Sequence, residues 1–155
     1  MLFNFTFGLA VQLSSTVEKL IRDIILQYDF HLESGGILVG RIEPLRSLFT
    51  ITDITYPQSR DSRLPLRFFR REEGHQEIMD TLWENSGYEK MYLGEWHTHN
   101  TSTPTPSIKD LHEWKRCVEK KKNTPNVLFL IVGTKAARLW TIRRTSVYTA
   151  NEALI

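Results

Sequence analysis

The sequence predicts a mixed α/β sandwich of the α+β class, with a partly antiparallel curved sheet and about three helices. Strand-like segments alternate irregularly with segments of helical periodicity, which indicates a sheet covered by helices. The chain has 155 residues, of which 41% are hydrophobic and 25% are charged, and this composition is typical of globular proteins. No linker, repeat or low-complexity segment interrupts it, so we expect residues 1–155 to form a single domain.

The N-terminal part predicts a strand and then the clearest amphipathic helix in the chain. Three phenylalanines alternate with other residues and predict a strand over residues 3–12. The absence of Lys and Arg before this apolar stretch argues against a signal peptide. Ser15 and Glu18 have the spacing of a capping box at the start of a helix. The apolar residues that follow at helical spacing are Val17, Leu20, Ile21, Ile24, Ile25 and Tyr28.

The remaining elements follow from local composition. Apolar runs bounded by Gly, Pro and polar residues predict strands, and apolar residues three to four positions apart predict helices. In order, we expect strands over 37–42 and 48–56, a loop over 57–65, a short strand over 66–69, a helix over 73–86, a strand over 91–99, a stiff Pro-containing loop over 100–106, a helix from Ser107 to about Lys121, a buried strand over 127–132 and a hairpin strand over 137–142.

Charge and cysteine content narrow the classes of function. The chain has 20 basic and 18 acidic residues, a balance that does not predict nucleic-acid binding. A single cysteine, Cys117, excludes an intrachain disulfide and suits a reducing compartment. The longest apolar run, Val127 to Val132, is too short to span a bilayer. We therefore expect a soluble cytoplasmic protein with no membrane partner.

One stretch of the chain is locally basic. Its arginines are interpreted either as a solvated loop or as a docking surface for an acidic partner, and the sequence leaves both readings open. They are Arg60, Arg63, Arg67, Arg70 and Arg71.

The segment that carries chemistry surrounds His97 and His99. Side chains on a strand alternate, so these two imidazoles project from the same face and suit a metal such as zinc. Asp110, in the first turn of the next predicted helix, is available as a third, anionic ligand. Three protein ligands leave one tetrahedral position open, which is typical of a catalytic rather than a structural zinc site.

Each half of this pattern also has an ordinary structural reading. A His-x-His pair on a strand is unspecific, and Ser107 with Asp110 is a common helix-capping motif. A zinc site for hydrolysis also needs a general base. Glu95 lies on the same strand face as the histidines, whereas Glu33 lies far away in sequence, beside a Gly-Gly pair. The residues alone do not choose between these two carboxylates.

A resemblance adds to this reading. The pattern Glu33, then His97-Thr98-His99, seven residues, Ser107, two residues and Asp110 resembles the signature of the JAMM/MPN (JAB-domain) zinc metalloproteases. The segment from Glu33 to Gly40 also resembles the Glu-x-Gly-Gly-x-Leu-x-Gly strand of that family. The chain is most similar to the compact prokaryotic JAB-domain subgroup, whose members include deconjugating peptidases of anti-phage CBASS operons.

The resemblance implies a fold of cytidine-deaminase-like architecture and a role for each matching residue. His97, His99 and Asp110 would hold one Zn²⁺, Glu33 would be the general base, and Ser107 would hydrogen-bond the oxyanion. Thr98 and Asn100 replace the usual Ser and Pro of the family, and neither is a ligand. Glu95 and Thr98 are then expected to orient a ligand or to contact the substrate.

The activity implied is that of a zinc metallopeptidase that removes a ubiquitin-like or other conjugated C-terminus from a target lysine. Its partner would be a protein with an isopeptide or peptide bond at a C-terminal tail, with a nucleotidyltransferase conjugate as one such partner. The alternatives are a catalytically inactive scaffold that keeps the fold, and a metal-dependent nucleic-acid or nucleotide enzyme. Outside this site, His31 and His75 are expected to be surface or capping residues, and Cys117 a packing residue.

Overall fold

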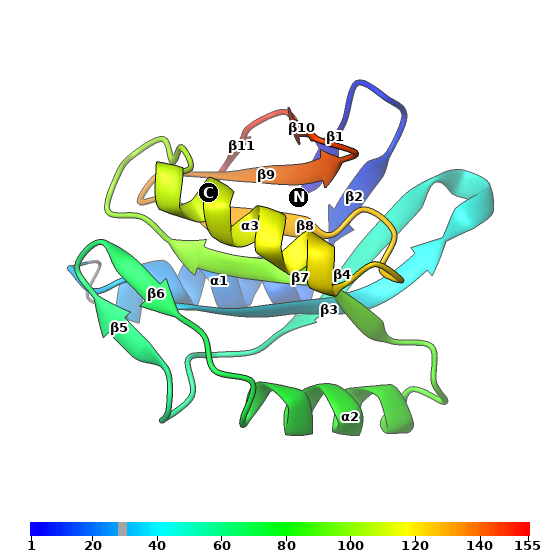
Figure 1. Cartoon of the computed structure of the whole chain (residues 1–155), viewed down its shortest axis with the longest axis horizontal. Helices are drawn as coiled ribbons and strands as arrows, with labels where there is room; N and C mark the ends of the chain where they lie inside the picture. Colours follow the sequence, from blue (N-terminus) through cyan, green and yellow to red (C-terminus); the bar gives the residue numbers. More distant parts are fainter. Residues whose placement is uncertain (28–30) are drawn as a thin grey trace.

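A curved nine-stranded sheet forms the centre of the computed structural model, which describes residues 1–27 and 31–155 (Figure 1). The strand order is β1-β2-β4-β3-β7-β8-β9-β10, and β11 also pairs with β9. Among the strand pairs of the described residues, only β2–β4 and β7–β8 are parallel. The strands of this sheet are β1 (Leu2–Asn4), β2 (Ala10–Leu13), β3 (Gly35–Glu43), β4 (Leu48–Ile54), β7 (Met91–Thr98), β8 (Leu128–Val132), β9 (Ala136–Arg143), β10 (Ser146–Thr149) and β11 (Ala153–Leu154).

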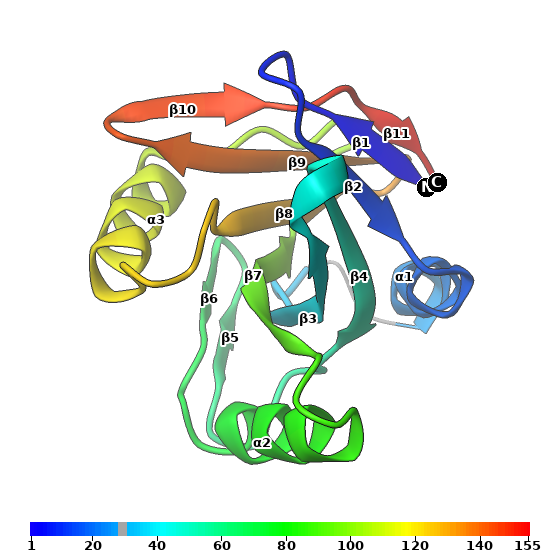
Figure 2. The same ribbon diagram turned by 90° about the vertical axis from the view of Figure 1, so that its right-hand side faces the viewer.

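Three helices and a separate hairpin surround the sheet in the described part of the chain. The hairpin consists of β5 (Ser62–Leu64) and β6 (Arg67–Phe69), and the helices are α1 (Ser15–Gln27), α2 (His75–Asn85) and α3 (Ile108–Lys120). Helices α1 and α3 lie on opposite faces of the sheet (Figure 2). The mixed α/β class, the number of helices and the largely antiparallel curved sheet confirm the fold class predicted from the sequence.

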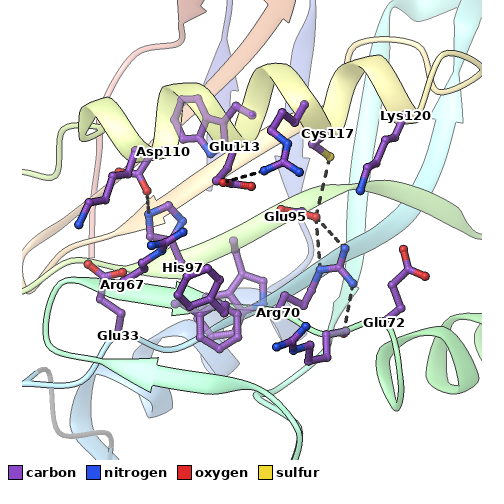
Figure 3. Close-up of a pocket in the computed structure, with 18 of the residues that line it drawn as sticks. Glu33, Arg67, Arg70, Glu72, Glu95, His97, Asp110, Glu113, Cys117 and Lys120 are labelled. Atoms are coloured by element: carbon purple, nitrogen blue, oxygen red, sulfur yellow. Dashed lines mark hydrogen bonds and ion pairs between the residues drawn. The ribbon is translucent and has the colours of Figure 1, made fainter.

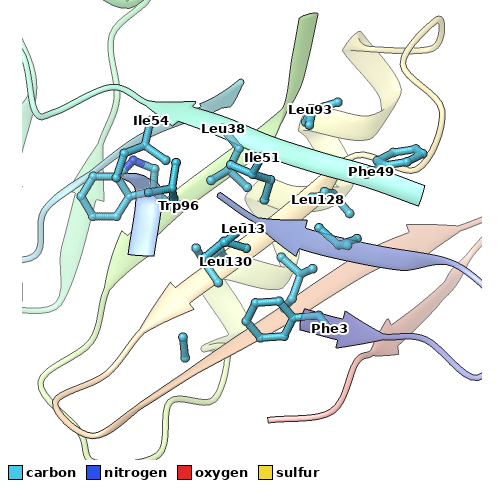
Figure 4. Packing of buried hydrophobic residues seen from close by; sticks show 14 of the residues in the cluster. Phe3, Leu13, Leu38, Phe49, Ile51, Ile54, Leu93, Trp96, Leu128 and Leu130 are labelled. Carbon is cyan, nitrogen blue, oxygen red and sulfur yellow. The ribbon is translucent and has the colours of Figure 1, made fainter. Parts of the chain in front are cut away.

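Strand β8 shows how the sheet separates two apolar layers. All five of its residues are buried. Leu128 and Leu130 face the larger core, together with residues from β1–β4 and α1 (Figure 4). Phe129 faces the other side, where Trp114 of α3 stacks on it with ring centroids 4.6 Å apart. Successive side chains of β8 thus point to opposite faces of the sheet, and those on one face pack against α3.

The N-terminal prediction of one strand over 3–12 is wrong, because the chain turns back on itself there. The segment forms β1 and β2, and Gly8 in the connection has a φ of 89°, which a residue without a Cβ adopts readily. The capping prediction was off by one residue. Ser14 rather than Ser15 caps α1, with its Oγ accepting from the Val17 N–H at 3.3 Å, while Glu18 pairs with the amino group of Met1. Tyr28, predicted on this helix, lies outside the described residues.

Short strands account for the other differences. The predicted loop over 57–65 contains β5, which pairs with β6 across a turn at Pro65 and Leu66. Strands β10 and β11 were not predicted at all. The turn before β10 carries no Gly or Pro, and Arg144 takes up a left-handed φ of 56° there. Within residues 1–27 and 31–155, no helix has the length and apolar character required to cross a bilayer.

Candidate metal centre

The two histidines stand at the end of β7, the central strand beside β3 and β8. Trp96 and Thr98 are buried on one side of the strand, so His97 and His99 project from the other, as strand alternation predicts. Their Nε2 atoms lie 3.0 Å apart, and their ring centroids are 4.8 Å apart. The His99 N–H donates to the Val132 carbonyl of β8 at 3.0 Å, which fixes the backbone that carries the second ring.

Asp110 reaches the histidines from the first turn of α3. Its Oδ1 lies 3.3 Å from His97 Nε2, and its Oδ2 lies 3.4 Å from His99 Nε2. The predicted capping box is also present. Ser107 N–H donates to Asp110 Oδ2 at 2.6 Å, and Ser107 Oγ accepts from Asp110 N–H at 3.1 Å. The cap therefore orients the carboxylate that faces the two imidazoles.

Glu33 approaches from the segment just before β3 and is buried. Its Oε1 lies 3.8 Å from His99 Nε2, and one donor atom each from Glu33, His97 and His99 all lie within 4.8 Å of one another. Gly35 pairs with His97 across the sheet, and a Cβ at Gly35 would lie 2.5 Å from the Phe68 ring. The glycine lets the backbone pass beneath this ring, which brings Glu33 to the histidines.

Thr98 holds the same segment from the opposite face of β7. Its Oγ1 accepts from the Ser34 N–H at 2.9 Å, and its own N–H donates to the Ser34 carbonyl at 2.8 Å. Thr98 is 2% exposed, so these bonds are protected from water. A hydroxyl between the two histidines thus ties the residue after Glu33 to the strand that carries both rings.

The donor set fits a tetrahedral metal ion. Ligand atoms about 2.0–2.1 Å from zinc stand roughly 3.3 Å from one another. The two Nε2 atoms are 3.0 Å apart, and the Asp110 carboxylate places Oδ1 3.3 Å from the His97 nitrogen and Oδ2 3.4 Å from the His99 nitrogen. Two imidazoles and a carboxylate are also ligands that zinc prefers. Glu33 is farther from these donors than they are from one another, so it stands beside the set.

The charges of the cluster influence one another. Burial raises the pKa of Glu33, although His97 and His99 oppose the shift. Burial would also raise the pKa of Asp110, but the hydrogen bonds from His97 and His99 hold that pKa well below its usual range. Glu33 is the carboxylate whose proton affinity is raised, and a raised pKa is a property expected of a general base.

Glu95 occupies a different position from Glu33. It projects from β7 two residues before His97, and its Oε1 accepts from Arg70 Nη2 at 2.9 Å. Tyr92 and Cys117 also contact this oxygen, at 3.5 and 3.8 Å. Its carboxylate is therefore engaged with a cation. The sequence suggested that Glu95 faces the site, but it gave no signal for Arg70 and Cys117, which lie 25 and 22 residues away.

A groove of about 1050 Å³ begins at the metal centre and runs along α3 (Figure 3). Glu33, His97 and Asp110 line one end, and Lys120 lies toward the other. Helix α3 forms one wall, β6 and the residues after it form the other, and β7 lies between them. A groove with the candidate ligands at one end can hold a chain segment against the metal centre.

His75 is the clearest residue that sequence reasoning misplaced. It is 1% exposed rather than a surface residue. Its Nδ1 lies 2.6 Å from Thr55 Oγ1, and its Nε2 lies 2.9 Å from the fully buried carboxylate of Asp61. Neither partner is a sequence neighbour, so local pattern could not reveal the burial. His31 is exposed, as expected.

Comparison with known proteins assigns the family. The family described as prokaryotic homologs of the JAB domain matches residues 17–144. This chain belongs to the prokaryotic JAB-domain family. The match covers the candidate metal centre and both walls of the groove, and it confirms the JAB-domain resemblance of the sequence.

Several relatives of this JAB-domain chain share a name. Proteins named CD-NTase/cGAS isopeptidase are 39% identical over 103 residues in Vibrio cholerae serotype O1 and 35% identical over 122 residues in Pseudomonas aeruginosa. These matches cover 66% and 79% of this chain, and 63% and 75% of the relatives. The chain thus spans less than two thirds of the length of the Vibrio protein.

A solved structure supports the fold alone. The solution structure of a protein from Desulfitobacterium hafniense superposes with a TM-score of 0.60 at 18% identity. The superposition covers 92% of this chain and 89% of that one.

Proposed function

We propose that this chain is a zinc-dependent isopeptidase that releases a protein conjugated through its C-terminal tail to a lysine of a target. The observation that carries the proposal is the convergence of His97, His99 and Asp110 at 3.0–3.4 Å, with the buried Glu33 beside them. Membership of a JAB-domain family whose relatives are named isopeptidases supports the type of bond.

In this proposal His97, His99 and Asp110 hold the zinc ion. A zinc ion bound there supplies Lewis-acid chemistry, polarising a carbonyl and lowering the pKa of a water molecule to about 7. Glu33 takes a proton from the attacking water on its carboxylate and passes it to the departing lysine amine. Burial raises the pKa of Glu33, which is a property expected of a group that accepts a proton and then passes it on.

Ser107 would bind the oxyanion. Its Oγ accepts from the Asp110 N–H, so its own hydroxyl hydrogen remains available to donate. Loss of one such donor commonly costs roughly 10²–10³ in rate. The capping bonds fix the position of this hydroxyl relative to Asp110, so one structural motif serves both the ligand and the donor.

The groove would hold the conjugated tail as an extended strand. Among the described residues, β6 pairs with β5 on one side only, which leaves its other edge toward the groove. Adding a strand to such an edge is a common way to bind an extended peptide. From the names of the relatives, we propose a CD-NTase conjugate as the substrate and anti-phage defence as the setting. A cytoplasmic location is part of this proposal, since one cysteine suits a reducing compartment.

Cleavage of a purified conjugate tests the proposal. The substrate is a CD-NTase whose C-terminus is joined to a lysine of a second protein, and the products are separated by mass. We expect release by the wild-type chain, loss of release with a chelator, and recovery on adding zinc. Glu33→Gln should reduce the rate at least roughly 10²-fold, because the proton acceptor is lost.

Glu119→Gln is the matched control, because Glu119 is exposed on α3 and does not line the groove. Equal rates for the Glu33 and Glu119 variants would contradict the proposed role of Glu33. Tight binding of the conjugate without any release by the zinc-loaded chain would instead support the scaffold alternative.

A further inference from the structure

The arginine stretch predicted from the sequence is largely engaged within the protein. Arg70 binds Glu95 at 2.9 Å, and Arg60 binds Glu73 at 3.4 Å. Arg63 donates from Nε to the Glu33 carbonyl at 3.3 Å. These contacts remove most of the stretch from the set of cations available to an acidic partner.

Other cations line both walls of the groove without a carboxylate partner among the described residues. They comprise two arginines on the β6 wall and three lysines on the α3 wall. Four groove-lining carboxylates lack a Lys or Arg partner in the same part of the structure: Glu72 and Glu77, and at the metal centre Glu33 and Asp110, whose contacts are with histidines. The balance of unpaired charge in the groove is therefore positive. We call the five residues the groove cations: Arg67, Arg71, Lys109, Lys120 and Lys121.

Two groove cations rest on aromatic rings. Arg67 lies 3.6 Å from the centroid of the Phe69 ring, and Lys121 lies 5.0 Å from that of Tyr92. A ring face holds a cation in place without neutralising its charge. These two side chains are therefore positioned to meet a ligand carboxylate.

The spacing along α3 sets the length of chain that these charges can contact. From Asp110 to Lys120 the helix axis advances about 15 Å at about 1.5 Å per residue. An extended peptide covers that distance with about five residues. A tail whose scissile carbonyl is at the metal centre would place its preceding residues between the groove cations.

We propose that the groove selects a peptide tail that carries acidic side chains within about five residues of the scissile bond, paired with the groove cations on both walls. The assignment of the ligand as a tail rests on the proposed isopeptidase function. The selection by charge rests on the excess of groove cations over unpaired groove carboxylates. It therefore applies to any extended peptide bound there.

A binding experiment without cleavage separates these two claims. The probes are three alanine- and serine-based octapeptides that carry Glu, Gln or Lys at the fourth and fifth positions from the C-terminal end. Binding to the full chain is followed by ¹H–¹⁵N NMR titration at low and at high salt. We expect the Glu peptide to bind roughly fivefold more tightly than the Gln peptide at low salt, with the difference reduced at high salt.

Charge reversal at the far end of the groove should remove this preference. In the double variant Lys120→Glu, Lys121→Glu we expect the Glu peptide to bind no more tightly than the Gln peptide. Lys115→Glu is the matched control, since Lys115 is exposed on the same helix and does not line the groove. It should keep the wild-type preference.

Three results with the peptides would overturn the proposal. They are equal affinity for the three peptides, shifts that map outside β6 and α3, and the same effect from Lys115→Glu as from the double variant. Stronger binding of an oligothymidylate than of the Glu peptide to the groove would also overturn it, in favour of a nucleic-acid ligand. Failure to cleave a conjugate would affect only the proposed function, because these measurements do not involve hydrolysis.

Discussion

At the scale of single residues, Asp110 shows that a structural reading and a metal-site reading can describe the same side chain. Its Oδ2 accepts the Ser107 N–H at 2.6 Å and also faces His99 Nε2 at 3.4 Å. A capping carboxylate is held in one orientation by the helix that it caps. The capping bonds therefore orient the Asp110 carboxylate toward the histidines. The capping and metal-site readings of Ser107 and Asp110 are compatible.

Cys117 yields a pH-dependent prediction at the same scale. Burial, together with the Glu95 carboxylate, raises the pKa of its thiol from 9.0 to about 11. The thiolate is the reactive form, so at pH 8 the folded chain should hold about a hundredfold less of it than an unexceptional cysteine. We expect the rate of alkylation by iodoacetamide to rise about tenfold per pH unit and to level off only near pH 11.

The urea-unfolded chain provides the reference, because its thiol should titrate near the ordinary value. A folded-state rate that levels off at the same pH as the unfolded rate would contradict the predicted shift. A merely slower rate would not decide the matter, since partial burial alone restricts access to the sulfur.

At the scale of elements, a buried network holds the base of the β5–β6 hairpin. Asp61 accepts from the Arg71 N–H and from the Gln58 N–H, both at 2.7 Å, and so joins the two ends of the hairpin. His75 of α2 connects Asp61 to Thr55 at the end of β4, at 2.9 and 2.6 Å. The hairpin that forms one wall of the groove is thereby attached to the main sheet.

His75→Ala should weaken this attachment. The change leaves the Asp61 carboxylate and the Thr55 hydroxyl buried without their partner, which should cost about 3 kcal/mol in the free energy of unfolding. Denaturant unfolding measures the loss, and tryptic cleavage within the hairpin should become faster. His112→Ala, at an exposed position on α3, should change stability by no more than about 0.5 kcal/mol. Similar unfolding curves for the two variants would show that the network does not contribute this much to the free energy of unfolding.

The same elements show where sequence reasoning succeeds and where it stops. The positions of His97 and His99 on one face of β7, and of Asp110 in a capped first turn, follow from local periodicity and were predicted. Strand β5 has three residues, of which only Leu64 is apolar, so it carries no hydrophobic signal and was missed. The burial of His75 depends on partners 14 and 20 residues away, and no local pattern encodes them.

At the scale of the whole molecule, the sheet order brings together what the chain keeps apart. Strand β3 lies directly beside β7, so Gly35 pairs with His97 although 62 positions separate them, and Glu33 is carried to the histidines. Strand β8 fixes α3 through Trp114 and Phe129, which sets the helix that carries Asp110 over the same end of the sheet. The proposed centre thus depends on three separate segments, and it should form only in the folded chain.

Metal content measured on the purified chain tests the central claim most directly. After zinc loading and removal of free metal, we expect about one zinc per chain in the wild type and in Glu33→Gln, with the content lost in His99→Ala and Asp110→Ala and kept in His112→Ala. Zinc retained in full by both the His99 and Asp110 variants, or absent from the correctly folded wild-type chain, would contradict the proposed centre.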